Sequence, residues 1–392
     1  MFQPGNSFHR ATLHGRYRDL DPPLTACGFE LFVLFVMPPT ACNKSLRRAY
    51  GDGTTVREGV LASGSREMRN WLRNNPGLVL YLVAPVFGEL FSGSAPLNEF
   101  VNPFAWAVLT LLYGGGAVIA RELVVRWQRG WWSLFALGVA YGVFEEGIVV
   151  RSFFDPNWMD LANLAHYGRV GGVNWVWSLH LSLFHALISI AASVAFVEAL
   201  YPGQRRESWV QRRLWWWGAW LGVAIVAVLG PYLNPYDAPD LHLVLTWGLV
   251  IALVGLARVL PPRRERTVQE PRVGPWRFLV VGFLAIFGQF VIVYAGADGG
   301  AYPYPVAMVL LVLFAAGVCL LLKWWTSNWS AWDDRHRIAL VIGALSFFLI
   351  MGPITTNGQY PVMWYSNPVF LFLLWLAYRR VARNYRNAPQ AA

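Results

Sequence analysis

Apolar runs of about 18–22 residues recur through most of this chain, and their length restricts what it can fold into. A helix of about 20 residues crosses the hydrocarbon core of a bilayer, whereas a soluble core does not require so many runs of that length. The composition agrees, because 56% of the 392 residues are hydrophobic and only 14% are charged, against about 25% in a typical soluble domain. The 21 tryptophans favour the same class, since this side chain concentrates at the membrane–water interface. The sequence therefore predicts an all-α, polytopic integral membrane helix bundle.

We place ten candidate transmembrane helices between clusters of Pro and Gly, which mark turns. Their approximate ranges are residues 76–92, 104–125, 131–150, 174–200, 214–231, 241–260, 276–295, 305–322, 338–354 and 363–378. From Met68 onward, every Lys and Arg except Arg151 and Arg169 lies in alternate connections or at the adjoining span ends. Positive residues are retained on the cytoplasmic side, so both ends of the spanning region are expected in the cytoplasm.

Residues 1–67 differ from the rest, because they are polar and their best apolar run, residues 29–37, is too short to cross a bilayer. We expect a disordered cytoplasmic extension there, with Met68 as an alternative start, followed by a transmembrane domain over residues 68–392. The net charge of +10 does not indicate nucleic-acid binding, because the basic residues alternate between loops and form no single patch. Three scattered cysteines are too few for a disulfide framework or a metal site, and we expect no cofactor.

Two adjacent acidic residues, Glu145 and Glu146, interrupt the apolar run 131–150. A charged side chain at the bilayer centre costs about 2.5–3.5 kcal/mol on insertion scales, so it is rarely found there without a partner or a role. In the predicted topology this span runs outward, which places both carboxylates in the outer half of the membrane. Glu89, near the outer end of the first span, lies at a similar depth. Gln289, in the seventh span, is expected to make a helix–helix hydrogen bond.

The following span runs inward and carries His180 and His185 in the same outer half. A polar stripe with helical spacing runs down it, and its members are Ser178, Ser182, His185, Ser189 and Ser193. His180 is rotated by about 140° from His185 and faces elsewhere. Asn174, at the outer start of the span, and Ser182 are accessory candidates. Whether the glutamates meet His180 or His185 is left open by the spacing.

Small residues on the third span predict how the acidic pair is buried. Gly138, Gly142 and Glu146 share one helix face, where small residues let another backbone approach closely. Glu146 should therefore be buried against a neighbouring helix. The loop 151–173, the longest external connection, is expected to cap a cavity that opens outward.

Three functions are compatible with this polar cluster. The carboxylates could pair with Arg151, His180 or serine hydroxyls and serve only to fix helix packing. A carboxylate beside an imidazole can instead activate water, with the carboxylate as general base and the imidazole stabilising the oxyanion. In the third case the glutamates bind a proton or cation and couple it to transport, which interrupted helices weakly favour. A metal site with Glu and His as ligands is the least favoured alternative, because His180 and His185 are five residues apart and do not share a face as paired metal ligands do. We therefore expect no metal.

The segment Phe144-Glu145-Glu146-Gly147, followed by Arg151 and by His185 on the next helix, resembles the CAAX-protease and bacteriocin-processing family of glutamate-dependent intramembrane proteases. The resemblance implies a metal-independent hydrolase in which Glu145 or Glu146 activates water. It also implies that His180 or His185 helps to stabilise the oxyanion, with Arg151 in the same site. Four residues separate Glu146 from Arg151 here, where the family has three.

Residues 141–202 also resemble a group of uncharacterised bacterial polytopic membrane proteins, through SFFDPNW at 152–158 and GVNWVW at 172–177. This second likeness implies no activity. We expect a multi-pass protein of the bacterial cytoplasmic (inner) membrane, whose partners are membrane lipids and a membrane-embedded substrate or solute, with no nucleic acid. An intramembrane hydrolase is the leading hypothesis, and a proton- or ion-coupled transporter or a purely structural role is the alternative.

Overall fold

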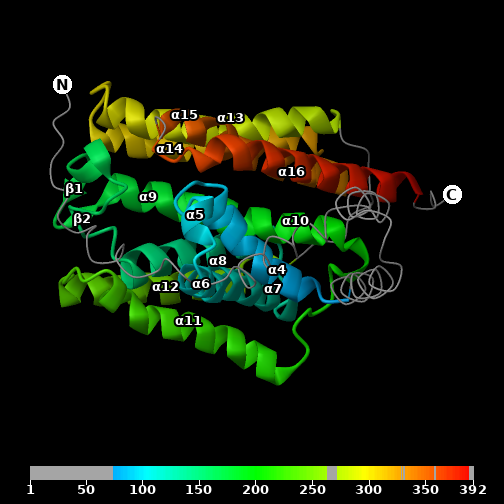
Figure 1. Cartoon of the computed structure of the whole chain (residues 1–392), viewed down its shortest axis with the longest axis horizontal. Coiled ribbons are helices and arrows are strands. Elements are labelled where there is room, and N and C mark those ends of the chain that lie inside the picture. The colour runs from blue at the N-terminus through cyan, green and yellow to red at the C-terminus, as the bar shows by residue number, and fades with distance from the viewer. Residues whose placement is uncertain (1–73, 263–271, 328, 330–331, 357–358, 388–392) are drawn as a thin grey trace, which may run out of the picture.

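The structure is a computed structural model that describes residues 74–262, 272–327, 329, 332–356 and 359–387. It is a bundle of helices with one short antiparallel hairpin at one end (Figure 1). Strand β1 (Arg169–Val170) pairs with β2 (Val173–Asn174) in this hairpin. Apart from this hairpin, the described secondary structure is helical, which confirms the predicted all-α polytopic architecture. The predicted extension over residues 1–67 and the alternative start at Met68 lie outside the described residues.

Each of the first four predicted spans is a helix whose α winding changes to π winding part-way along. These are α4 (Pro76–Pro85) with η1 (Val86–Leu90); α6 (Pro103–Leu109), η2 (Thr110–Gly114) and α7 (Gly115–Arg126); α8 (Trp131–Phe144) with η3 (Glu145–Val149); and α9 (Trp175–Phe184), η5 (His185–Ala192) and α10 (Ser193–Leu200). Short helices α5 (Leu97–Phe100), η4 (Ala162–Ala165) and η6 (Pro202–Gln204) lie in the connections.

The remaining six predicted spans are continuous α-helices. They are α11 (Arg213–Leu233), α12 (Asp240–Val259), α13 (Pro275–Ala297), α14 (Tyr304–Trp325), α15 (Asp334–Thr355) and α16 (Val362–Asn387). Within the described part of the chain, eight helices are long and apolar enough to cross a membrane. The first predicted span is represented by the shorter apolar helix Pro76–Leu90, and the tenth lies within α16, which is outside that set of eight.

Side-chain caps fix where several of these helices begin. The side chain of Asn102 accepts hydrogen bonds from two backbone N–H groups of α6, and Pro103 follows at the first helical position, where its missing N–H costs nothing. Asn174 caps α9 through the N–H of Trp177, and Asp333 caps α15. The starts of these three helices are therefore encoded locally, by a short polar side chain just before the helix.

The helix formed by α9, η5 and α10 is the centre of the bundle. Its most apolar window is 89% buried, against 6% for α12 and 17% for α14, which lie at the periphery. Figure 1 shows α13–α16 on one side of this central helix, and α4, α7 and α8 on the other, with α11 and α12 beyond them. Peripheral helices expose apolar side chains such as Leu245 and Val312, as lipid-facing helices do.

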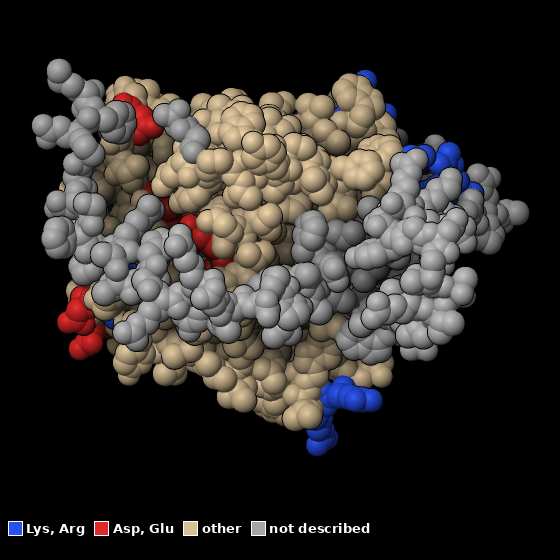
Figure 2. Space-filling view, viewed as in Figure 1, with Lys and Arg blue, Asp and Glu red and all other residues tan. Residues whose placement is uncertain are grey.

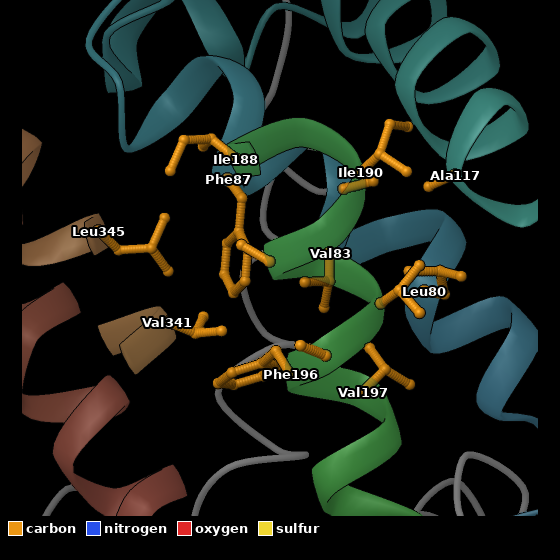
Figure 3. Close-up of a cluster of buried hydrophobic side chains, with 14 of the residues drawn as sticks. Leu80, Val83, Phe87, Ala117, Ile188, Ile190, Phe196, Val197, Val341 and Leu345 are labelled. Atoms are coloured by element: carbon orange, nitrogen blue, oxygen red, sulfur yellow. The ribbon is translucent and has the colours of Figure 1, made fainter. Parts of the chain in front are cut away.

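Interlocking apolar side chains hold the central helix in place. Figure 3 shows Phe87 and Val83 from the first helix beside Ile188 and Phe196 of the central helix, with Leu345 of α15 closing the cluster. The rings of Phe87 and Phe196 meet edge to face at 5.1 Å between centroids. Lipid tails are as apolar as these side chains, so close packing and dispersion, more than exclusion of water, stabilise this contact.

The charged side chains separate along the bundle. Figure 2 shows Lys and Arg gathered at the end where α16 finishes, and Asp and Glu at the opposite end and over the middle of this face. The hairpin and the loop that contains it lie at the end away from the basic residues (Figure 1). Alternate connections therefore lie at the same end of the bundle, as the charge pattern predicted.

Candidate functional site

The two glutamates of the third span and one histidine of the fourth meet inside the bundle. His185 Nε2 lies 2.9 Å from Glu146 Oε1, and His185 Nδ1 lies 3.2 Å from Glu145 Oε2. All three side chains are buried, with exposed fractions of 4% for Glu145, 7% for Glu146 and 2% for His185. The imidazole is thus clasped between two carboxylates, one at each ring nitrogen. We call Glu145, Glu146 and His185 the central triad.

A second group of polar side chains surrounds the central triad. Ser152 donates a hydrogen bond to Glu146 Oε2 and accepts one, of 3.0 Å, from the indole N–H of Trp177. Ser189 lies one turn below His185, with its hydroxyl 3.0 Å from Nδ1. These contacts fix the position of Glu146 Oε2 and the orientation of the His185 imidazole.

The first two helices contribute Glu89 and two tyrosines. Tyr113 donates a hydrogen bond to Glu89, and the Glu89 carboxylate is close enough to interact electrostatically with Glu145, Glu146 and His185. The rings of Tyr113 and Tyr141 lie 6.0 and 5.9 Å from the imidazole, and both hydroxyls lie near the Glu145 carboxyl group. Three carboxylates therefore lie around a single imidazole.

Each of the four helices changes to π winding where it supplies a side chain to this site. Glu89 lies in η1, Tyr113 in η2, the two glutamates in η3, and His185 with Ser189 in η5. A π turn inserts one residue into an α-helix and re-aims the side chains there, and such turns occur frequently at functional sites. Four π turns converging on one cluster make a role in packing alone a poor explanation.

Close helix approach, as the sequence predicted, brings the triad together. A methyl group on Gly138 would lie 2.8 Å from the Cα of Ala186, and one on Gly142 would lie 3.1 Å from the Cα of Ser182. Neither glycine could carry a larger side chain without moving the central helix away. The prediction that these glycines bury Glu146 against a neighbouring helix is confirmed.

The structure brings only some of the candidate residues into this site. His180 turns to α13, where it lies 3.0 Å from Gln289 Nε2 and edge-on to Phe290. The interpretation in which a glutamate meets His180 is therefore wrong, because the rotation of about 140° between the two histidines places them on different helix faces. The predicted helix–helix hydrogen bond of Gln289 is confirmed, since its side chain also donates to the His180 carbonyl.

Arg151, Asn174 and Ser182 have other contacts. Arg151 adopts a left-handed φ of 61° where the third span ends, and its guanidinium donates to the Tyr236 carbonyl at 2.6 Å. Neither glutamate is among its described contacts, so its expected place in the site is not supported by the geometry. Asn174 caps α9 and donates to the Leu164 carbonyl, and the backbone of Ser182 packs on Gly142.

Sequence reasoning did not assign Tyr113, Tyr141, Ser152 and Trp177 to the site. Glutamate and histidine are conspicuous in an apolar span because burying their charge is costly. A tyrosine or tryptophan carries no such penalty and is common in membrane helices, so its hydroxyl or N–H gives no comparable signal. Ser152 lies just beyond the third span, and only the turn at Arg151 aims its hydroxyl back at Glu146.

The loop 151–173 is held over this end of the bundle by hydrogen bonds. Arg169 donates to the carbonyls of Phe154 at 2.7 Å and Ala165 at 2.8 Å, and Asn163 donates to Asp298 at 2.9 Å. Burial, followed by the Glu146 carboxylate, raises the pKa of Asp160 above its ordinary value. The electrostatic influence of Glu146 thus reaches into the loop, which the sequence predicted would cap this region.

A second polar cluster lies at the opposite end of the bundle. Arg121, 1% exposed, donates to Glu122 at 2.8 Å and to the Glu207 carbonyl at 2.6 Å, and stacks over the ring of Trp209. A cavity of about 350 Å³ beside it is lined by Arg129 and Arg205 among other residues. Arg121 donates hydrogen bonds to backbone carbonyls of the loop after α10, so this cluster joins that loop to the bundle.

The chain matches a known family over most of its length. A model of an uncharacterised membrane protein family matches residues 78–384, which is more than half of the chain. The chain belongs to that family. The match includes the central triad and all four helices that surround it, and it agrees with the likeness to uncharacterised polytopic membrane proteins. No solved structure matches the chain significantly. The match does not show the resemblance to glutamate-dependent intramembrane proteases, which stays a prediction.

Proposed function

We propose that this multi-pass membrane protein is an intramembrane hydrolase with protease-like chemistry, in the cytoplasmic membrane of a bacterium. The single observation that carries the proposal is the imidazole of His185 held between Glu145 at 3.2 Å and Glu146 at 2.9 Å inside the bundle. A carboxylate and an imidazole within hydrogen-bond reach of one another are the groups that general acid–base hydrolysis requires. The charge pattern, with most basic residues on this face at one end of the bundle, supports the cytoplasmic orientation of both ends (Figure 2).

The roles follow from the contacts of each group. Glu145 Oε2 is buried, and its only described contact is with His185 Nδ1 at 3.2 Å, which does not meet hydrogen-bond geometry, so it can accept a hydrogen bond from a water molecule. It takes a proton as the water oxygen adds to the substrate carbonyl carbon. His185, held by Glu146 and Ser189, stabilises the resulting oxyanion and gives a proton to the leaving group as the carbon–nitrogen bond breaks. Glu145 then returns its proton to the histidine, directly or through water.

The substrate of such a site is a membrane-embedded peptide, because the triad lies within the spanning helices. The loop 151–173 would limit access from the outer face. Tyr141, whose buried hydroxyl has no hydrogen-bond partner in the described structure, is a candidate second donor to the oxyanion.

The decisive experiment uses purified protein in lipid nanodiscs with a library of quenched-fluorescent transmembrane peptides. Glu145→Gln, Glu146→Gln and His185→Gln should each lower kcat/KM by about 10²–10⁴-fold, the range that general acid–base catalysis contributes. Glu99→Gln, at an exposed position in α5, is the matched control and should cleave normally. Cleavage that is unchanged in both triad glutamate variants, at normal expression and folding, contradicts the proposal.

One observation favours a second candidate, a proton-coupled transporter. Polar side chains from four helices and the loop after the third span form a continuous spatial chain. It runs from Glu89 and Tyr113 through the central triad to Ser152. Proton relays in transporters are built from such chains of carboxylates and imidazoles. Proton uptake into proteoliposomes that depends on Glu89 and Glu146, without cleavage of any peptide, would replace the hydrolase with this candidate.

A further inference from the structure

The central triad together with Glu89 carries more negative charge than its described partners can neutralise. Glu89, Glu145 and Glu146 together have three carboxylates, and the only basic group in contact with them, among the residues that the structure describes, is His185. Arg151 donates to the Tyr236 carbonyl, and Arg169 to loop carbonyls. Uncompensated charge is costly at this depth in a membrane, so protons or a bound cation must balance it.

The donor set favours a cation. Glu145, Glu146 and His185 each offer one ligand atom, and these atoms all lie within 4.8 Å of one another. To share one ion with Glu146 and His185 Nε2, the Glu145 side chain, which lies against Nδ1, must rotate toward the Nε2 side of the ring. One imidazole nitrogen and two carboxylate oxygens are ligands that Zn²⁺ accepts, and three protein ligands with one open position are typical of catalytic zinc sites.

The side chains around the triad are those that a metal site needs. A ligating histidine almost always donates from its other ring nitrogen, and a ligating carboxylate is itself hydrogen-bonded. Ser189 lies 3.0 Å from His185 Nδ1, which leaves Nε2 for the ion. Ser152 donates to Glu146 Oε2, which leaves Oε1, and these two remaining atoms face each other at 2.9 Å. An ion placed there replaces the hydrogen of that contact.

Unpartnered polar atoms give independent support. The hydroxyl of Tyr141, a residue that is 7% exposed, is buried beside Glu145 and has no hydrogen-bond partner within the described structure. Glu145 Oε2 lies 3.2 Å from His185 Nδ1 but makes no hydrogen bond of good geometry. Buried polar atoms are almost always satisfied in native proteins, so the Tyr141 hydroxyl and this oxygen can both take a further partner, such as a bound ion's water ligand.

We infer that Glu145, Glu146 and His185 form a binding site for one divalent transition-metal cation of the Zn²⁺ class. Ser152 and Ser189 orient the ligands, and Tyr141 faces the group bound at the open position. The inference goes beyond the proposed function, because binding can be measured whether or not the protein cleaves peptides. In the proposed hydrolase the same ion would polarise the attacking water. The sequence disfavoured a metal because His180 and His185 do not share a helix face, whereas the inferred site uses one histidine and two glutamates.

The test measures metal on the full chain, purified without a histidine tag in detergent. After EDTA treatment and dialysis, Zn²⁺ is titrated by calorimetry, and the protein reloaded with Zn²⁺ is analysed by mass spectrometry. We expect about one equivalent of Zn²⁺, and Co²⁺ substitution should give the visible absorption of a low-coordinate site. Glu146→Gln and His185→Gln should lose both signals. Ser152→Ala should weaken the affinity about 10–100-fold, as removal of such supporting contacts does.

Two controls keep the test decisive. His180→Gln removes a buried histidine from the same helix but outside the triad, and Glu99→Gln removes an exposed carboxylate. Both should bind Zn²⁺ as the unmodified protein does, and Zn²⁺ should raise their Tm equally, since a ligand that binds only the folded state stabilises it. The inference is overturned if the unmodified protein binds no stoichiometric metal, or if His185→Gln binds it as tightly. Failure of the hydrolase is seen separately, as an absence of cleavage by protein shown to be loaded with metal.

Discussion

Gly142 lies so close to His185 that a methyl group added to the glycine would be 3.0 Å from the histidine Cβ. Only a hydrogen at this position allows the third span and the central helix to approach until Glu146 reaches the imidazole. Gly142→Ala should destabilise the protein by about 1–3 kcal/mol, the usual cost of overpacking, and separate the carboxylate from the ring. Thermal unfolding in detergent measures the first effect, and Zn²⁺ affinity or peptide cleavage measures the second.

The control for that substitution is Gly218→Ala in α11. A methyl group there would meet no atom within 4 Å. Its effect should be neutral or stabilising by up to about 1 kcal/mol, because alanine is the better helix former. Equal behaviour of the two variants would show that the close contact at Gly142 does not limit the packing.

Ser152→Ala should cost more than the loss of one surface hydroxyl. The substitution leaves Glu146 Oε2 without its donor and the Trp177 N–H without its acceptor, and both groups are buried. Two unsatisfied buried groups should lower the free energy of unfolding by about 1–3 kcal/mol. Ser178→Ala is the matched control, because the Ser178 hydroxyl only donates to the carbonyl of Asn174 in its own helix, and about 0.5 kcal/mol or less is expected. A Tm for Ser152→Ala equal to that of Ser178→Ala would contradict this role.

Asp333 should make stability depend on pH at the start of α15. Burial alone would raise its pKa, but hydrogen bonds from His336 and Arg335 outweigh burial and hold the pKa well below its ordinary value. A carboxylate with a depressed folded-state pKa contributes stability above its unfolded pKa of about 3.9, and this stability is lost as the pH falls through the folded-state pKa. Asp333→Asn should therefore lower the free energy of unfolding by about 1.5–3 kcal/mol at neutral pH.

Thermal melts of the two proteins from pH 3 to pH 8 check this prediction. The difference in Tm should be constant near neutrality and shrink in acid, below about pH 4, where Asp333 of the unfolded chain takes up a proton while the native Asp333 stays ionised. Glu99→Gln provides the exposed comparison, with no change in Tm expected across the range. A difference between Asp333→Asn and the native protein that persists unchanged at pH 3 would point to amide geometry as its cause, and not to charge.

Arg121→Gln should be among the most destabilising single substitutions at the basic end. Its guanidinium is 1% exposed, bonds to Glu122 at 2.8 Å and joins the loop after α10 through the carbonyls of Arg205 and Glu207. Removing one partner of a buried ion pair typically costs about 3–5 kcal/mol, because the other charge stays buried. Expression level and Tm measure the loss, with exposed Arg213→Gln as the control. Near-normal stability of Arg121→Gln would mean that water or another group replaces the lost contacts.

Much of the fold was predictable because the signals are local. The run 276–295 predicted for the seventh span corresponds to Pro275–Ala297, and the run 305–322 to Tyr304–Trp325. Such agreement reflects bilayer thickness, which sets helix length without reference to neighbours. The close helix–helix contact at Gly138 and Gly142 could also be predicted, since small residues at helical spacing indicate such a contact whichever helix approaches.

The site was less predictable because it depends on rotation between helices. A periodic pattern places His180 and His185 on different faces but does not say which face meets the glutamates. The π turns at η3 and η5 alter the direction of side chains by adding a residue to a turn, and no local pattern in Glu145–Val149 announces one. Tyr113 comes from a helix far from Glu145 in the sequence, and only packing joins them.

The amino-acid sequence by itself determined that this protein is a helical, multi-pass membrane protein with carboxylates buried where they need a partner, because hydrophobic length and the cost of buried charge act residue by residue. The tertiary structure alone decided that His185 is that partner, that His180 bonds to Gln289 instead, and that Ser152, Tyr113 and Tyr141 complete the surroundings. Those choices depend on how four helices rotate and pack against one another, and the energy of packing belongs to pairs of surfaces that no single stretch of sequence contains.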